Sequence, residues 1–268
     1  MSIRASIGQY YSTDSPIHRL DPRVKLVGTI VYMVSCFFVS SVASLLLAGV
    51  AVGAVVALAH VPVKRLLSQI KPIVLFLVIT SFINLFFVQT GALVFTLGPI
   101  AIHQGGIEAA ILYTLRFFLL LVAGSLLTLT TTPVALTDAA EKLLAPLEHL
   151  GVPVSQGTLI LSIALRFVPT LSREAEHIVA AQTARGADLE NKGAIAYARA
   201  CVPLIVPLFA SALRHADNLG RAMDARCYTG AGRTHYHVMR LSAQRDYPAI
   251  ALLVLYLALL VVVRVALA

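Results

Sequence analysis

Long apolar runs, separated by short polar stretches, dominate the first half of the chain. Four segments reach the length of about 20 residues that a membrane-crossing helix needs. They are 42–59, 72–89, 107–129 and 247–268. A shorter apolar stretch, 26–39, leads through Ser40 and Ser41 directly into the first of these. A single helix over both would far exceed the thickness of a bilayer, so we predict a helical hairpin with a tight turn and five membrane spans in all.

The pattern changes over 130–245, where most charged residues lie. We predict an amphipathic helix over 134–150 and two long helices over 154–187 and 192–227, each about 50 Å long. The long helices are apolar in their first halves and charged in their second halves, and the apolar parts are too short to cross a bilayer. Prolines within these helices are expected to bend them. These are Pro169, Pro203 and Pro207.

Loop charges predict the orientation of the spans. Basic residues precede the first span and fill the loop before 72–89 as well as the segment 130–245, so the N-terminus and that segment are expected in the cytoplasm. The loop 90–106 has no lysine or arginine and is expected outside, with a short extended hairpin around Leu97–Gly98–Pro99. We therefore expect residues 1–129 to hold four spans, 130–245 a cytoplasmic domain and 246–268 the last span.

Composition supports an all-α membrane protein. The chain is 58% apolar and only 13% charged, whereas a soluble domain carries about 25% charged residues. The net charge of +8 fits retention of cations on the cytoplasmic side, and no basic stripe interleaved with aromatics indicates nucleic-acid binding. The three cysteines lack CxxC spacing, and His235 and His237 have no acidic or cysteine companion, so no metal site is predicted.

Two further features have two interpretations each. Small residues spaced three or four apart on the long helices favour close crossing of two backbones over mere helix propensity, because Gly220 lowers propensity. They are Ala180, Ala184 and Ala187, and Ala212, Ala216 and Gly220. Arg116 lies within the span 107–129, where a charge is costly. We favour a contact inside the bundle, to Ser, Thr or a backbone carbonyl, over a role in a transport pathway.

Two arginines stand where the long helices end, Arg185 and Arg226, each after an alanine and before a small residue. An arginine in the last turn is ordinary, because the helix dipole favours a cation there. The repeated pattern also describes a narrow tip that enters a groove on a partner and presents its guanidinium to a carboxylate. The pattern alone does not decide between these interpretations.

Four sequence segments resemble the T component of energy-coupling factor transporters, a vitamin-importing class of ATP-binding-cassette systems. These are IHRLDPRVKL at 17–26, RFVPTLSREAE at 166–176, QTARGAD at 182–188 and AMDARCYTGAGRT at 222–234. The resemblance runs from about residue 10 to the C-terminus. It implies a transmembrane subunit that joins two cytoplasmic ATPases to a membrane-embedded substrate-binding S component through two crossed coupling helices.

The resemblance also implies roles for single residues. Each coupling helix ends in an Ala-Arg-Gly motif that docks in an ATPase groove, which here corresponds to Ala184, Arg185 and Gly186 and to Ala225, Arg226 and Cys227. Cys227 replaces the second glycine, which leaves the cap geometry there open. The apolar helix halves would face the S component, with Leu159, Leu161, Leu165, Phe167, Leu204, Leu208 and Phe209 as the candidate residues.

The expected function is mechanical coupling in the membrane, without catalysis. The chain has no GxxxxGK[ST] phosphate-binding loop, so ATP and Mg are expected on the partner ATPases and no cofactor on this chain. The alternatives are a stand-alone secondary transporter, which predicts inverted repeats that the chain lacks, and a membrane-embedded enzyme, which predicts clustered carboxylates or histidines within the spans. Neither the substrate nor whether one or several S components share this subunit follows from the sequence.

Overall fold

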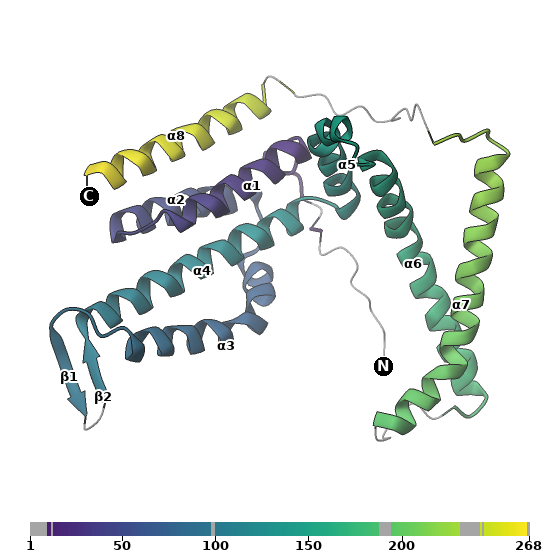
Figure 1. Ribbon diagram of the computed structural model, residues 1–268, viewed down its shortest axis with the longest axis horizontal. Coiled ribbons are helices and arrows are strands. Elements are labelled where there is room, and N and C mark those ends of the chain that lie inside the picture. The colour runs from purple at the N-terminus through teal and green to yellow at the C-terminus, as the bar shows by residue number, and fades with distance from the viewer. Residues whose placement is uncertain are drawn as a thin grey trace. The chain divides into compact units, whose positions relative to one another are not determined.

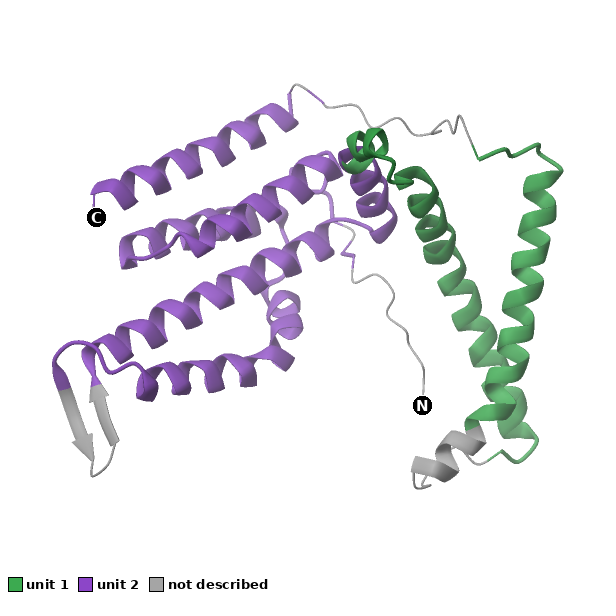
Figure 2. Cartoon of the chain, in the orientation of Figure 1, with its two compact units in different colours: residues 1–7, 144–238 green, residues 8–143, 239–268 purple. Residues whose placement is uncertain are grey.

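The computed structural model describes residues 10–11, 13–97, 100–187, 194–230, 242 and 244–266, and in these it is helical apart from one β-hairpin. The chain divides into two compact units (Figure 2). Unit 1 comprises residues 1–7 and 144–238, and unit 2 comprises residues 8–143 and 239–268.

Unit 2 contains most of the apolar helices. Its helices are α1 (Pro22–Phe37), α2 (Val42–Ala59), α3 (Val63–Phe87), α4 (Gln104–Thr130), α5 (Pro133–Leu144) and α8 (Asp246–Ala266). The predicted hairpin of helices is confirmed, because only four residues join α1 to α2. Local caps define both starts: the Asp21 side chain accepts a hydrogen bond from the Arg23 N–H, and Ser41 forms a capping box with Ser44.

The core of unit 2 lies where α1 and α2 pack between α4 and α8 (Figure 1). Polar side chains inside this core bond to one another and to the backbone. The Tyr32 hydroxyl donates to the Ala48 carbonyl at 2.9 Å, and the Ser35 hydroxyl lies 2.9 Å from that of Tyr256. The rings of Tyr32 and Tyr256 are 5.6 Å apart. Hydrogen bonds between helices therefore supplement apolar packing, which is typical of membrane bundles.

Two cationic side chains connect α1 and the turn after it to α4, one near each end of α1. The Lys25 ammonium donates to the Thr130 carbonyl at 3.0 Å, and the Arg116 guanidinium donates to the Val39 carbonyl. Lys25 and Val39 lie fourteen positions apart, as do Arg116 and Thr130, and fourteen residues correspond to about 21 Å of helix. The residue numbers rise along α1 while those of the partners on α4 fall, so the two helices are antiparallel. The expectation that Arg116 contacts a backbone carbonyl inside the bundle is thereby confirmed.

A tight junction connects α3 to α4. The predicted extended hairpin is confirmed as β1 (Leu93–Leu97) paired antiparallel with β2 (Ile100–His103), while its turn at Gly98–Pro99 falls outside the described residues. At the start of α4, two glycines approach backbone carbonyls closely. A Cβ on Gly105 would lie 2.7 Å from the Thr90 oxygen, and one on Gly106 would lie 2.7 Å from the Leu85 oxygen.

Unit 1 consists of the 3₁₀ helix η1 (Ala145–Leu150) and two long helices, α6 (Val154–Ala184) and α7 (Ala194–Asp224). Each long helix has 31 residues, which corresponds to about 47 Å. Among the described residues of unit 1, only Thr158 and Ser211 are buried. Unit 1 therefore has almost no apolar core of its own.

The structure differs from the sequence-based expectations in three boundaries. Helix α5 belongs to the same unit as the membrane helices, where Ala139 is fully buried, although we expected it in the domain 130–245. It ends at Leu144 and continues as a 3₁₀ turn instead of running to residue 150, since Pro146 has no N–H to donate. Helix α3 begins at Val63, before the expected start at 72, because it continues through Pro72.

Five helices in the described part of the chain are long and apolar enough to cross a membrane: α2, α3, α4, α6 and α8. The number matches the expected five spans, but the members differ. Helix α1, which we expected as the first span, has only 16 residues. Helix α6 qualifies because its apolar half continues without interruption through Pro169, whereas we expected it to be too short.

The glycine contacts generate a prediction for stability. Gly106→Ala places a methyl group against two backbone carbonyls, those of Leu85 and Val88, and should lower the free energy of unfolding by about 1–3 kcal/mol. The control is Gly53→Ala on α2, where a Cβ meets nothing within 4 Å and alanine favours the helix. Thermal unfolding in detergent measures both, and equal midpoints for the two variants would contradict the close approach.

Candidate functional site

The helix α6 ends in a Schellman motif that places Arg185 at the C-cap. The Gly186 N–H donates to the Thr183 carbonyl at 2.9 Å, and the Ala187 N–H donates to the Gln182 carbonyl at 3.0 Å. Gly186 has a φ of 84°, a left-handed conformation that glycine adopts without a steric cost. We call Ala184, Arg185 and Gly186 the first tip.

The helix α7 ends with the same hydrogen bonds at Arg226. The Cys227 N–H donates to the Asp224 carbonyl at 2.9 Å, and the Tyr228 N–H donates to the Met223 carbonyl at 3.1 Å. Cys227 has a φ of 55°, so cysteine takes the position that glycine has in the first tip. We call Ala225, Arg226 and Cys227 the second tip. The substitution of cysteine for glycine therefore leaves the cap geometry intact.

All six residues of the two tips are exposed within unit 1. Among the described residues, no hydrogen bond or ion pair holds the guanidinium of Arg185 or Arg226. The Schellman bonds use backbone groups alone, so they fix the direction of the chain at each tip without engaging the arginine side chains. Both guanidinium groups are therefore available to a carboxylate of a partner.

The contact between α6 and α7 is polar and aromatic. The Ser211 hydroxyl donates to Glu174 Oε1, and His215 Nε2 lies 3.5 Å from Glu174 Oε2. The Phe167 ring packs against the His215 ring with centroids 5.8 Å apart. Neither Glu174 nor Ser211 has a sequence pattern around it that marks it as a contact residue, and both were absent from the predicted set.

The small residues predicted at the crossing lie mostly on other faces of these helices. Ala180, Ala216 and Gly220 are exposed within unit 1, and a Cβ on Gly220 would meet nothing within 4 Å. Ala187 and Ala212 are half-buried. The described contacts between α6 and α7 are made by the side chains of Glu174, Ser211, His215 and Phe167.

The apolar residues predicted to face a partner are only partly covered. Leu161 and Phe209 are 50% and 64% exposed, respectively. The others, which are half-buried, are Leu159, Leu165, Phe167, Leu204 and Leu208. Further exposed apolar side chains accompany them on the same helix halves, including Ile160, Ile205 and Val206. The first halves of α6 and α7 thus present apolar surface to lipid or protein.

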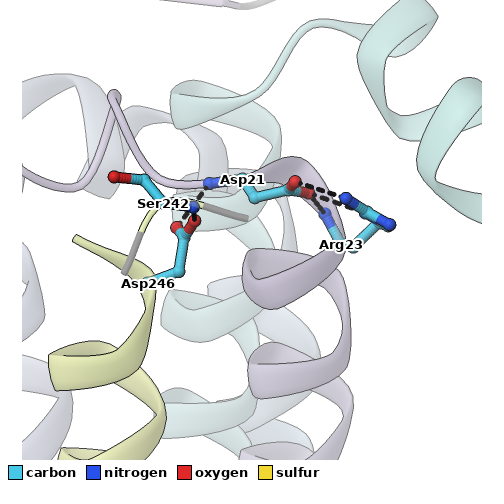
Figure 3. A network of polar contacts seen from close by, with 4 residues as sticks. All are labelled: Asp21, Arg23, Ser242 and Asp246. Carbon is cyan, nitrogen blue, oxygen red and sulfur yellow. Dashed lines mark hydrogen bonds and ion pairs between the residues drawn. The ribbon is translucent and has the colours of Figure 1, made fainter. Parts of the chain in front are cut away.

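A network of polar contacts in unit 2 joins the starts of α1 and α8 (Figure 3). The Asp246 carboxylate accepts from the Asp21 N–H at 3.0 Å through Oδ1 and from the Ser242 N–H at 2.6 Å through Oδ2. The Asp21 carboxylate accepts from the Arg23 N–H at 2.8 Å and from its Nη2 at 2.9 Å. We call Asp21, Arg23, Ser242 and Asp246 the Asp21–Asp246 cluster.

The cluster stabilises the charged form of Asp21. Burial raises the pKa of this carboxyl, but the hydrogen bonds and charge of Arg23, together with the charge of Lys142, outweigh burial and hold the pKa below its ordinary value. Both carboxylates also face helix N-termini, which carry partial positive charge. Asp21 and Arg23 lie in the resemblance segment 17–26, whereas nothing in the sequence marked Asp246, which lies 225 positions away from Asp21.

No metal or catalytic centre emerges in the described part of the chain. No group of three or more His, Cys, Asp or Glu side chains there is arranged to hold a metal ion. His235 and His237 fall outside the described residues. The chemistry that the geometry offers is the recognition of carboxylates by the two arginine tips.

The two tips generate a prediction from their single difference. A non-glycine residue in the left-handed region is strained by about 1–2 kcal/mol, so Cys227→Gly should stabilise the second tip by up to about 1 kcal/mol after the greater flexibility of the unfolded chain is subtracted. Gly186→Ala should destabilise the first tip by about as much. Hydrogen exchange of the Tyr228 and Ala187 amides measures both. Slower exchange in the first variant and faster exchange in the second are expected, and the reverse order would contradict the cap assignment.

Comparisons with known proteins agree with this architecture. The CbiQ family, described as "Cobalt transport protein", matches residues 13–236. A relative from Ruminiclostridium cellulolyticum, "Energy-coupling factor transporter transmembrane protein EcfT", is 42% identical over 238 residues, 88% of this chain and 89% of the relative. A Bacillus subtilis protein of the same name is 39% identical over 250 residues, 93% of this chain and 94% of the relative.

A third relative is longer than this chain. "Putative ABC transporter ATP-binding protein" of Bifidobacterium longum is 44% identical over 249 residues, 92% of this chain but only 32% of the relative. The chain therefore spans about a third of that relative's length, whereas it covers nearly all of the other two. The family match and these relatives show that the chain belongs to the CbiQ/EcfT family, the transmembrane components of energy-coupling factor transporters.

Proposed function

We propose that this chain couples two cytoplasmic ATP-binding-cassette ATPases to a membrane-embedded, substrate-binding S component, for ATP-driven uptake of vitamins or related micronutrients. The observation that carries the proposal is the pair of arginine tips with the same backbone hydrogen bonds. Two equivalent ends suit two equivalent partners, so one tip would dock in each ATPase.

Membership of the CbiQ/EcfT family supports this proposal. Members of the CbiQ/EcfT family are transport components without catalysis of their own, and the chain is a multi-pass membrane protein. The energy for transport would come from the partners, which would bind the ATP and Mg. This division of work agrees with the absence of a GxxxxGK[ST] motif from the sequence.

The long relative supports an ATPase partner. Its name describes an ATP-binding protein, and a third of its length aligns with this chain. A segment like this chain and an ATP-binding function therefore share one polypeptide in that relative. Segments that are joined in one protein commonly act on each other, so we extend the association to separate subunits here.

The exposed apolar surface of unit 1 supports a second partner within the membrane. Two helices with almost no core of their own need other surfaces to cover Leu161, Phe209 and their neighbours. Lipid would cover part of this surface and the S component the rest. The choice of substrate would then belong to the S component.

The charge distribution supports a cytoplasmic position for the tips. Most basic residues lie in the N-terminal segment, in the first part of α3 and in unit 1, and basic residues are retained in the cytoplasm. In this orientation the N-terminus and both tips would face the cytoplasm, where ATP is available, and the β1–β2 hairpin would face outward.

Charge reversal at the tips tests the proposal. Arg185→Glu combined with Arg226→Glu would place carboxylates against the carboxylates of the ATPase grooves and should reduce the co-purified ATPases by about tenfold or more. The measurement is the amount of ATPase that a tagged T component retains in detergent.

The matched control is Arg221→Glu. Arg221 lies near the end of α7, is 76% exposed at its side chain and pairs with Asp217 on the same helix. Its reversal changes the net charge as each tip mutation does but leaves both tips unchanged, so the ATPases should stay bound. Full ATPase retention by the double tip variant would refute docking through the arginines.

A further inference from the structure

Two of the three covalent connections between unit 1 and unit 2 lie close in sequence to residues of, or next to, the Asp21–Asp246 cluster. The chain leaves unit 2 at the end of α5, directly after Lys142, and Lys142 attracts the Asp21 carboxylate electrostatically. It returns at residue 239, three positions before Ser242. Movement of unit 1 that is conveyed through either of these two connections would therefore arrive close to this cluster.

Asp246 fixes the returning segment at the start of α8. Its Oδ2 accepts from the Ser242 N–H at 2.6 Å, and its own N–H donates to the Ser242 carbonyl at 2.9 Å. This reciprocal pair works like a capping box and makes residue 242 part of the helix end. Because the side chain is only 2% exposed, water cannot easily replace these bonds.

The second oxygen of Asp246 extends the attachment to α1. It accepts from the Asp21 N–H at 3.0 Å, and Asp21 in turn caps α1 and binds Arg23. One carboxylate therefore uses both oxygens as acceptors for two separate chain segments. An amide could replace only one of these acceptors, since its NH₂ group would face a second N–H donor.

The helix ends themselves favour this arrangement electrostatically. Helices α1 and α8 start side by side, and two adjacent N-termini, each with about half a positive charge, repel each other. The carboxylates of Asp21 and Asp246 lie at these two starts. Loss of one carboxylate would thus weaken both the hydrogen bonds and the attraction that keeps α1 beside α8.

We propose that Asp246 and Asp21 are positioning residues for transport, which transmit the movement of unit 1 to the paired helices α1 and α8. The inference rests on the proposed coupling function, because that function supplies the movement. Without the cluster, the ATPases would still bind the tips and hydrolyse ATP. Residue 242 would no longer be held to the starts of α1 and α8, so movement of unit 1 would displace α1 and α8 less.

The test measures uptake per ATP hydrolysed in proteoliposomes that hold the whole complex of T component, ATPases and S component. The probes are ATP and a mixture of tritiated water-soluble vitamins. Asp246→Asn should leave ATPase co-purification and hydrolysis within about twofold of the unmodified complex and lower uptake per ATP about tenfold, as expected for the loss of a buried hydrogen bond to a charged group. Asp246→Glu, which keeps both oxygens, should restore part of the ratio.

The matched control is Asp14→Asn. Asp14 pairs with Arg19 at an exposed site in the same N-terminal region, and its side chain is 76% exposed. Its loss should change neither hydrolysis nor the uptake ratio. If Asp246→Asn does not assemble, Asp21→Asn decides instead, because asparagine still caps α1 but loses the charge that pairs with Arg23.

The possible outcomes separate the two proposals. Equal losses of hydrolysis and uptake, with an unchanged ratio, would indicate a purely structural role and overturn this inference. An unmodified complex that lacks ATPases would contradict the proposed function itself. A lower ratio with intact ATPase binding would support both.

Discussion

The structure depends on satisfying the polar groups of helix ends that lie at the membrane. In lipid no water replaces a missing partner, so the polar groups of a helix end need partners within the protein. Asp21 and Asp246 supply acceptors at the starts of α1 and α8, and Lys25 supplies a donor for the Thr130 carbonyl at the end of α4. These three charged residues bring three helix ends together, and the packing of the bundle follows from that placement.

The two units divide stability and function between them. Unit 2 has a buried core with hydrogen bonds between helices, whereas unit 1 has two long helices held by the Glu174–Ser211–His215 contact. The described residues of unit 1 have little buried apolar area, so the pairing of its two helices is locally less stable than the core of unit 2. The tips of unit 1 are nevertheless locally rigid, because the Schellman bonds fix the backbone around Arg185 and Arg226. The tips are thus locally ordered ends on helices that bury little apolar surface of their own.

Local sequence patterns predicted most of the helices. Contacts between segments that lie far apart in the sequence were not predicted. The apolar runs gave α2 and α4, and the repeated small–Arg–small pattern identified both tips, because a helix end depends on neighbouring residues. Asp246 could not be found in this way, since its partner Asp21 lies 225 positions away. The spacing of small residues likewise did not point to Glu174 and Ser211, whose hydrogen bond joins α6 to α7, and a Cβ on Gly220 would meet nothing within 4 Å.

The short α1 has a consequence for the surrounding lipid. Lys25 and Arg116 bind α1 and its following turn at two levels about 21 Å apart, yet the hydrocarbon layer of a typical bilayer is about 30 Å thick. Exposed Val27, Ile30 and Val34 lie between those levels. An apolar segment shorter than the hydrocarbon layer is accommodated by local thinning of the bilayer, by snorkelling of flanking side chains or by association with another protein. An apolar partner of matching height beside α1 would relieve such a mismatch.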